Sequence, residues 1–211
     1  MDDVDAYCER LAPGLWAEPL NAVSNAAFLV AAAVLWWRHR PQTRDLRALP
    51  VLLALVGLGS LSFHTVADTL TNWFDIGFIA VYVIWYLVVF AHHYLGARWA
   101  IAWLAAPAFV VLAVATAPLG ALVPGGSGIY LAPFLCLLAV TAIAAVRRMT
   151  WHDLASAAGV FVVSVTLRTL DQPLCGAWPS GTHYSWHVLN AVVLFLVARQ
   201  VIRVQRAADR T

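Results

Sequence analysis

Residues 76–91 read IGFIAVYVIWYLVVFA, a run without a charged side chain that lies between Asp75 and the pair His92–His93. A helix needs about 20 mainly apolar residues to cross a bilayer. With its neighbours, this run predicts a membrane-spanning helix over residues 74–94. Similar stretches occupy residues 20–37, 49–66, 99–118, 128–146, 154–170 and 184–203. The sequence therefore predicts an all-α membrane protein, a bundle of seven transmembrane helices.

The composition supports this class. Hydrophobic residues make up 62% of the 211 residues and charged residues only 11%, and the mean hydropathy is +0.77. These values exclude an ordinary soluble domain. The net charge of +2 is too small to indicate a nucleic-acid partner. Because the acidic start of the chain lacks the basic residues of a signal peptide, we expect residues 1–211 to form one uncleaved domain.

The arginines predict the orientation. Eleven of the 13 basic residues, all of them arginines, lie in alternate connections and in the tail: Arg38, Arg40, Arg44, Arg47, Arg98, Arg147, Arg148, Arg199, Arg203, Arg206 and Arg210. Basic residues accumulate on the cytoplasmic side of membrane proteins. We therefore expect an external N-terminus and a cytoplasmic C-terminus.

Three histidines fall on the external side in this topology. His183 and His187 lie four residues apart at the start of the last helix, a spacing that puts both rings on one helix face. His64 ends the second helix. A single histidine near a helix end is more often an ordinary interfacial residue, but ionisable groups in membranes tend to mark function. Together the three indicate an open zinc site.

Two acids compete for a catalytic role beside this site. Zinc lowers the pKa of a bound water towards about 7. Asp75, at the expected start of the third helix, would accept the proton of that water as general base and then act as acid. Its structural alternative is to cap that helix. Asp68 is the rival acid, or else a loop carboxylate or a hydrogen-bond partner of a metal ligand.

Ser60 lies one helical turn before His64, on the same helix face. Its hydroxyl would donate a hydrogen bond to a carbonyl oxygen as negative charge develops there. The alternative is that Ser60 serves close helix packing together with Gly57 and Gly59. The pattern itself leaves both roles open.

The order of the motifs resembles the alkaline ceramidase family, seven-helix zinc amidases of a superfamily that also includes the adiponectin receptors. The motifs span nearly the whole chain: Tyr7-Cys8-Glu9, Glu18-x-x-Asn21-x-x-x-Asn25, Gly59-Ser60-x-x-x-His64, Asp75, Asp171-x-x-x-Cys175 and His183-x-x-x-His187. The resemblance implies that the three histidines bind zinc, that Asp75 deprotonates the bound water and that Ser60 supports the oxyanion. The implied reaction splits ceramide into a sphingoid base and a fatty acid.

The resemblance also implies a calcium site near the N-terminus. Glu9 and Glu18 match the two glutamates of the family's site, but Ala6 and Leu11 replace its aspartate and asparagine. Asp5 lies one residue early. Because calcium takes six to eight oxygen ligands, the site is either rebuilt with Asp5 and backbone carbonyls or absent.

The three cysteines divide by compartment. Cys8 and Cys175 are both external in the expected topology, which permits a disulfide, and the resemblance implies that they form one. Cys136 falls within the fifth helix, where we expect a packing role.

Arg168, near the outer end of the sixth helix, departs from the family's pattern. We expect an ion pair with Asp171, one turn later. The alternative is that Arg168 recognises an acidic lipid headgroup or the carboxylate of the product.

The leading hypothesis is a zinc-dependent membrane amidase whose substrate is ceramide or another N-acyl lipid. The arginine-only basic complement and the short loops suggest a bacterial inner membrane, with the site towards the periplasm. A competing hypothesis is a non-enzymatic receptor or structural metal protein with the same three-histidine centre. A second is haem ligation by two histidines, for example His64 and His187. Three external histidines and few carboxylates are too few ligands for a di-iron centre.

Overall fold

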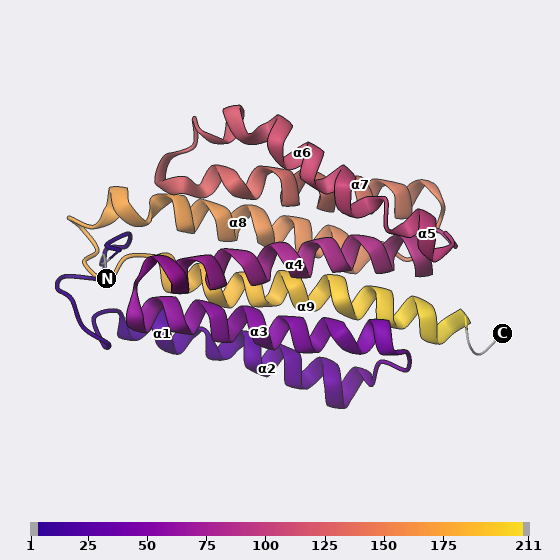
Figure 1. The fold of residues 1–211 in the computed structure, drawn as a ribbon, viewed down its shortest axis with the longest axis horizontal. Helices are drawn as coiled ribbons and strands as arrows, with labels where there is room; N and C mark the ends of the chain where they lie inside the picture. Colours follow the sequence, from indigo (N-terminus) through magenta and orange to yellow (C-terminus); the bar gives the residue numbers. More distant parts are fainter. Residues whose placement is uncertain (1–3, 209–211) are drawn as a thin grey trace.

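The computed structural model describes residues 4–208, and this part of the chain is helical, without strands. Seven of its helical segments are long and apolar enough to cross a membrane: Pro19–His39, Arg44–Val66, Thr69–His93, Trp99–Gly120, Pro124–Val146, His152–Leu174 and His183–Ala208. They lie side by side in one elongated bundle (Figure 1). The expected all-α bundle with seven helices that could span a membrane is thus confirmed, whereas the orientation of the termini stays a prediction.

Four spans consist of one continuous helix, and two more begin with a short helical segment. The second, third, sixth and seventh spans are α3 (Arg44–Val66), α4 (Thr69–His93), α8 (His152–Leu174) and α9 (His183–Ala208). The fourth combines α5 (Trp99–Ala102) with α6 (Ala105–Gly120). The fifth combines the 3-10 turn η2 (Pro124–Tyr130) with α7 (Leu131–Val146). The chain therefore crosses with few interruptions.

The first span is divided. It comprises α1 (Pro19–Ser24), α2 (Ala26–Val34) and the π-helical turn η1 (Leu35–His39). Asn25 separates α1 from α2, and its side-chain Nδ2 donates to the carbonyl of Asn21 at 2.8 Å. Ser24 also donates to this carbonyl. Polar side chains thus bond the backbone of α1 next to the bundle interior.

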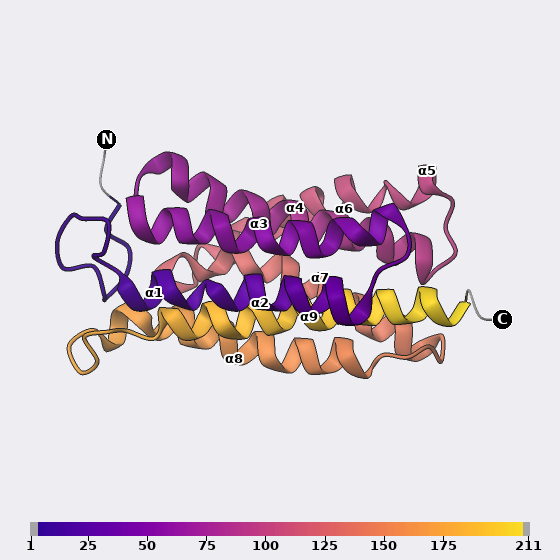
Figure 2. The same cartoon turned by 90° about the horizontal axis from the view of Figure 1, so that it is seen from below.

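Helix α9 lies at the centre of the bundle, where it packs against α8 on one side and against α1, α2, α3 and α4 on the other (Figures 1 and 2). The α5–α6 span lies at the periphery, against α4 and α7. Residues 4–18 cross the end of the bundle at which α3 ends and α9 begins. That end carries all three histidines identified in the sequence.

The start of α4 corrects one expectation. This helix begins at Thr69 rather than at residue 74, because Asp68 and Thr71 form a capping box. The Asp68 carboxylate accepts from the backbone N of Thr71 at 2.8 Å, and the Thr71 hydroxyl accepts from the backbone N of Asp68 at 3.1 Å. Asp75 therefore lies in the second turn of α4, buried, and does not cap the helix.

A close approach of α3 and α4 brings Ser60 and Asp75 together. A Cβ atom on Gly59 would lie only 2.9 Å from the carbonyl oxygen of Phe74. Glycine at position 59 therefore lets the backbones of α3 and α4 approach closely. Ser60 follows Gly59 on α3, and Asp75 follows Phe74 on α4. Gly57 plays the same packing role against Phe28 of α2. Gly57 and Gly59 thus permit close helix packing, and the Ser60 hydroxyl lies beside the Asp75 carboxyl.

Candidate metal centre

Three histidine rings meet inside the end of the bundle. His64 belongs to the last turn of α3, His183 is the first residue of α9 and His187 follows one turn later. One nitrogen of each ring lies within 4.8 Å of those of the other two, and the residues are 0%, 2% and 1% exposed, respectively. The structure therefore brings the predicted ligands together. Within residues 4–208, this is the group that could hold a metal ion.

A carboxylate orients the ring of His64. Its Nδ1 is 2.6 Å from Oε2 of Glu18, which as a carboxylate accepts the Nδ1 proton. This tautomer leaves a lone pair on Nε2 of His64. That atom is buried and has no hydrogen-bond partner, as expected for a nitrogen that ligates a metal.

A hydroxyl orients the ring of His187 in the same way. The Ser24 hydroxyl donates to the carbonyl of Asn21 at 2.8 Å, so its oxygen is free to accept a proton from His187 Nδ1 at 2.7 Å. The lone pair of His187 then lies on Nε2. His64 and His187 thus have the same arrangement, in which the outer nitrogen is hydrogen-bonded and the other is available to a metal.

His183 is positioned through its backbone and its ring face. The backbone N of His183 donates to Oδ1 of Asp171 at 2.9 Å, and the Tyr7 ring stacks on the imidazole with centroids 3.6 Å apart. Nδ1 of His183 is buried without a hydrogen-bond partner. Burial raises the pKa of the Tyr7 phenol, which therefore stays protonated above the ring.

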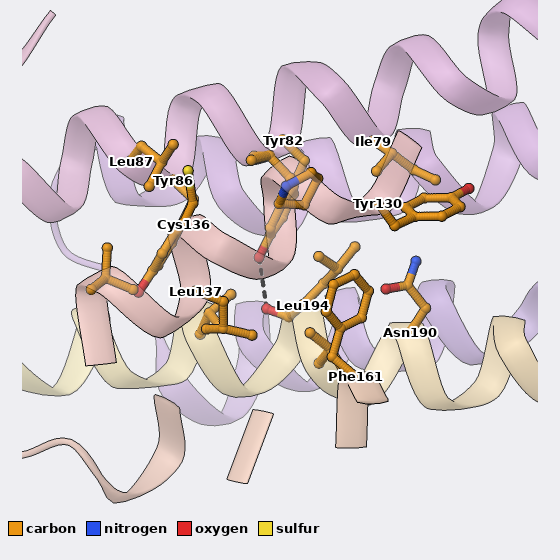
Figure 3. Close-up of a pocket in the computed structure, with 15 residues that line it drawn as sticks. Ile79, Tyr82, Tyr86, Leu87, Tyr130, Cys136, Leu137, Phe161, Asn190 and Leu194 are labelled. Carbon is orange, nitrogen blue, oxygen red and sulfur yellow. Dashed lines mark hydrogen bonds between the residues drawn. The ribbon is translucent and has the colours of Figure 1, made fainter. Parts of the chain in front are cut away.

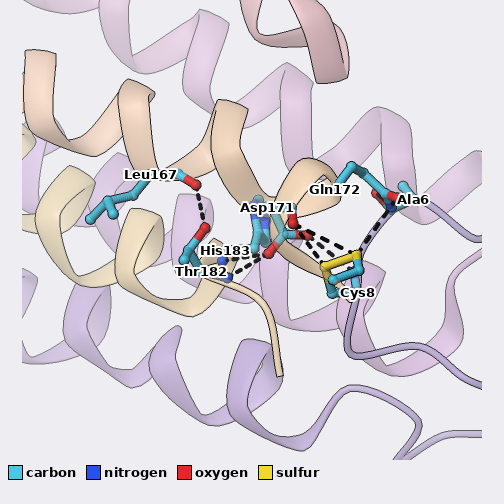
Figure 4. The surroundings of a disulfide bond; sticks show 8 residues. Ala6, Cys8, Leu167, Asp171, Gln172, Thr182 and His183 are labelled. Carbon is cyan, nitrogen blue, oxygen red and sulfur yellow. Dashed lines mark hydrogen bonds between the residues drawn. A yellow bond between two sulfur atoms is a disulfide. The ribbon is translucent and has the colours of Figure 1, made fainter. Parts of the chain in front are cut away.

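Asp171 of α8 anchors the start of α9 from outside that helix. Besides the His183 bond, its carboxylate accepts from the backbone N of Thr182 at 2.6 Å and of Cys8 at 3.0 Å (Figure 4). Free N–H groups at a helix start need acceptors when they are buried. The Asp171 carboxylate is the acceptor for these N–H groups, so it fixes the position of His183 in the centre.

The predicted disulfide between Cys8 and Cys175 is present and joins the N-terminal segment to the end of α8 (Figure 4). Gln172 adds a hydrogen bond to the carbonyl of Ala6 at 2.8 Å. Together these links hold Tyr7 over His183. Cys136 is a free cysteine, half-buried in α7.

The glutamates expected near a calcium ion have other partners. Glu18 bonds His64, and its other oxygen forms a 2.6 Å ion pair with Arg10. Burial raises the pKa of Glu18, but hydrogen bonds from His64, Arg10 and Asn21 outweigh this effect and hold it below its ordinary value. Glu18 is therefore ionised, and a guanidinium is its counter-ion.

Glu9 accepts from the backbone N of Leu20 at 2.6 Å and of Asn21 at 2.8 Å, so its carboxylate lies at the start of α1. In residues 4–208, Asp5, Glu9 and Glu18 do not converge as a group of three metal ligands. A calcium site built on them stays a prediction without geometric support.

Asp75 and Ser60 lie next to the histidines. Both are buried, and the Asp75 carboxyl interacts electrostatically with His64 and with the Ser60 hydroxyl. Asp75 is outside the group of nitrogens that could ligate one ion. The structure thus places a carboxyl and a hydroxyl group beside the centre, whereas their catalytic roles stay predictions.

Haem ligation by His64 and His187 does not fit this geometry. Two axial histidines bind opposite faces of a porphyrin. The two ring centroids here are 4.6 Å apart and the ring planes are inclined by 65°, which leaves no room for a macrocycle between them.

An apolar pocket lies inside the bundle (Figure 3). On α4, Asp75 is followed at helical spacing by the lining residues Ile79, Tyr82 and Tyr86. On α9, His187 is followed at the same spacing by Asn190, Leu194 and Val197. Residues three and four apart share one helix face. The pocket therefore lies along the face of α4 that carries Asp75 and the face of α9 that carries His187.

Sequence reasoning missed several residues of this site. Ser24, Tyr7 and the backbone role of Asp171 were not identified as partners of the histidines. The polar residues Glu18, Asn21 and Ser24 interrupt an apolar helix at a spacing that puts them near one face, a signal that could have indicated a buried polar contact. No comparable signal exists for Tyr7, which acts from a loop.

Known proteins give no independent identification. No family model matches the chain, and no curated protein matches it. The resemblance to alkaline ceramidases therefore rests on the residues named above.

Proposed function

We propose that the protein is a zinc-dependent amidase that hydrolyses the N-acyl amide bond of ceramide or a ceramide-like lipid inside the membrane. The observation that carries this proposal is the buried group of three histidines, with Asp75 and Ser60 beside it. Three histidines and one open position form a catalytic zinc site. When bound, zinc supplies a Lewis acid and lowers the pKa of a water towards about 7.

Asp75 and Ser60 carry out the proton transfer and charge stabilisation in this proposal. The Asp75 carboxylate accepts a proton from water as the water oxygen bonds to the amide carbon. It then delivers that proton to the amine nitrogen as the C–N bond breaks. The Ser60 hydroxyl donates a hydrogen bond to the carbonyl oxygen, where negative charge develops. The products are a sphingoid base, or another amine, and a fatty acid.

The apolar pocket supports a lipid substrate. It is lined mainly by aliphatic and aromatic side chains of α4, η2, α7, α8 and α9, on the helix faces that also carry Asp75 and His187. An acyl chain in this pocket would present its amide to the histidines and exclude water from the site. The resemblance to alkaline ceramidases supports the same substrate class. We further infer that the site faces the periplasm of a bacterial inner membrane.

Metal analysis and lipid profiling of the purified protein test this proposal. Wild-type protein is expected to contain zinc and to release fatty acid from N-acyl lipids. His183→Ala should lose both the zinc and the activity. Asp75→Asn should keep the zinc and lose about 10²–10⁴-fold in turnover, the usual contribution of a general base. His152→Ala, an exposed histidine outside the centre, is the matched control.

The receptor or structural hypothesis makes the opposite prediction. Wild-type protein that binds zinc at the three histidines, folds normally and hydrolyses none of a broad panel of N-acyl lipids would reject the amidase and favour that alternative.

A further inference from the structure

Arg168 is a cation inside a membrane span whose hydrogen-bond partners are all neutral. Its Nη1 donates to the carbonyl of Gly125 at 2.7 Å and to the Ser127 hydroxyl at 2.9 Å, and its Nη2 donates to the Tyr7 hydroxyl at 3.3 Å. Within residues 4–208 it forms no ion pair. Charged groups in membranes are costly and usually functional. The positive charge of Arg168 therefore calls for a partner.

The expected ion pair with Asp171 is wrong. Both oxygens of Asp171 accept backbone N–H groups, those of Thr182 and His183 on one oxygen and that of Cys8 on the other. The acid is thus committed to the start of α9. The carboxyl of Asp75 interacts electrostatically with the guanidinium but forms no direct ion pair with it in residues 4–208.

One edge of the guanidinium, formed by Nε and Nη2, is only weakly hydrogen-bonded. Nη1 is occupied by its two contacts in η2, which fix the side chain. By contrast, Nε is buried without a hydrogen-bond partner, and Nη2 has the long bond to Tyr7. The Tyr130 hydroxyl also interacts with the guanidinium. Nε and Nη2 point their protons in parallel, the geometry that binds two oxygens of a carboxylate or phosphate. The Tyr7 hydroxyl is displaceable, because its 3.3 Å bond is weak.

The guanidinium lies near one residue of the metal centre and one residue of the apolar pocket. Its Cζ atom is 5.9 Å from the ring centroid of Tyr7, which stacks on His183. The same atom is 5.2 Å from the ring centroid of Tyr130, which lines the pocket at the end nearer the start of α9 (Figure 3). An anion on Arg168 would therefore sit next to the reacting amide.

We propose that Arg168 binds an anionic oxygen group of the lipid, a carboxylate or a phosphate, through Nε and Nη2. This inference rests on the proposed function and adds a specificity determinant to it. The anion has two sources, the headgroup of an anionic N-acyl lipid and the carboxylate of the released fatty acid.

Two pairs of ligands distinguish the sources. The first pair is a ceramide with a phosphate headgroup and the same ceramide without it, compared by turnover. The second pair is palmitate and its uncharged amide, compared by the shift in thermal midpoint that each causes in the zinc-loaded protein. We expect the wild type to prefer the charged member of at least one pair by about tenfold or more, the usual effect of a charge-assisted hydrogen bond. The tenfold difference refers to turnover in the first pair and to the affinity obtained from the midpoint shifts in the second.

Arg168→Met is expected to remove that preference while the neutral ligand changes by less than about threefold, since only the charge interaction is lost. Arg168→Lys should keep part of the preference that Arg168→Met loses, because lysine keeps the charge but lacks the paired N–H donors of the guanidinium. Arg147→Met, which removes an exposed arginine, is the control for net charge. Zinc content and thermal midpoint without ligand show whether each variant is folded.

Equal response of the wild type to charged and neutral members of both pairs would overturn the inference, as would a preference that persists in Arg168→Met. If Arg168→Met fails to fold, loss of the preference in Arg168→Lys is the deciding result. A zinc-loaded wild type that hydrolyses no lipid rejects the proposed function alone, since the palmitate pair still reports on Arg168.

Discussion

The outer nitrogens of two histidine rings are bonded to groups of different strength. His64 Nδ1 bonds the carboxylate of Glu18, whereas His187 Nδ1 bonds the neutral hydroxyl of Ser24. A charged acceptor makes a histidine more basic and fixes its tautomer more firmly than a neutral one does. The N-terminal segment and α1 therefore tune a site whose ligands all belong to other helices.

Glu18→Gln is expected to weaken zinc binding by about 10–100-fold, the range found when the outer partner of a metal-bound histidine is removed. Ser24→Ala should have a smaller effect, because the lost hydrogen bond is neutral. Competition with a chelator of known affinity measures both variants.

Glu9→Gln is the matched control, because Glu9 bonds the backbone of α1 and touches no histidine. Unchanged zinc affinity in Glu18→Gln, or an equal loss in Glu9→Gln, would contradict the role given to Glu18.

At this scale the sequence predicts the ligands better than their partners. His183 and His187 share a face by helical spacing alone, and the arginine distribution brings His64 to the same end. Ser24 and Tyr7 were not predicted, because a serine in an apolar helix and a tyrosine in a loop have no spacing that relates them to a distant ring. Asp171 was assigned to Arg168 by proximity in sequence, whereas tertiary contacts commit it to backbone N–H groups.

Among the secondary structure elements, the connection between α8 and α9 determines where the last helix begins. Gly181 in this connection has a φ of +65°, and a Cβ atom there would overlap Oδ1 of Asp171 and lie 2.9 Å from Cβ of Cys8. Only glycine accommodates both the left-handed backbone and this close approach.

Gly181→Ala is expected to lower the free energy of unfolding by about 1–3 kcal/mol, because it strains the backbone and displaces the acceptor of the N–H groups of α9. Zinc affinity should fall with it, since His183 would lose its position. Gly176→Ala is the control in the same connection, where no atom lies within 4 Å of the added Cβ and φ is not positive. Thermal unfolding and zinc titration measure both, and equal behaviour of the two variants would refute this explanation.

The disulfide joins two elements that are far apart in sequence. Cys8 and Cys175 are separated by 167 residues, and removal of a native disulfide typically costs about 2–5 kcal/mol. A reductant is therefore expected to lower the thermal midpoint of the wild type and its turnover, because Tyr7 is no longer held over His183.

The double variant Cys8→Ser/Cys175→Ser should show the lower midpoint without reductant and no further response to it. Cys136→Ala should keep the wild-type response, because Cys136 is not bonded. If reductant leaves the turnover of the wild type unchanged, the disulfide is not needed to position the site.

Helix positions were largely predictable, and helix ends were less so. Apolar runs located all seven spans, because the bilayer requires length and hydrophobicity together. The start of α4 was placed five residues late, since Asp68 and Thr71 are polar and read as loop, although they form a capping box. The end of α8 was placed at residue 170 rather than at Leu174, because the acid and amide at positions 171 and 172 also read as loop.

For the whole molecule, the two ends of the bundle differ in charge. The histidines and residues 4–18 lie at one end, whereas α3 begins and α9 ends at the other (Figure 1). Ten of the eleven arginines that predict the orientation lie in or near the helix ends and connections at this second end, and Arg210 lies outside the described residues. A fluorescent reporter fused to the C-terminus is expected to fluoresce in the bacterial cytoplasm, and alkaline phosphatase fused there to stay inactive. The reverse result would place the site in the cytoplasm.

The pocket relates the whole bundle to substrate length. It runs from Tyr130 and Asn190, near the start of α9, towards Tyr86 and Leu87 (Figure 3). Val197 lines it on α9, 5% exposed and almost three helical turns beyond His187. If the acyl chain enters from the metal centre, Val197 lies near its methyl end.

Val197→Phe is therefore expected to shorten the usable pocket and to shift the preferred N-acyl chain to a shorter length. Each buried CH₂ contributes about 0.8 kcal/mol, so the loss of space for two or three carbons should reduce turnover of the long-chain lipid by about tenfold or more, while a lipid shorter by those carbons is unaffected. Val192→Phe, on a half-exposed face of the same helix, controls for bulk and hydrophobicity. Turnover measured over a series of chain lengths tests this, and a profile that is the same in both variants would show that the acyl chain lies elsewhere.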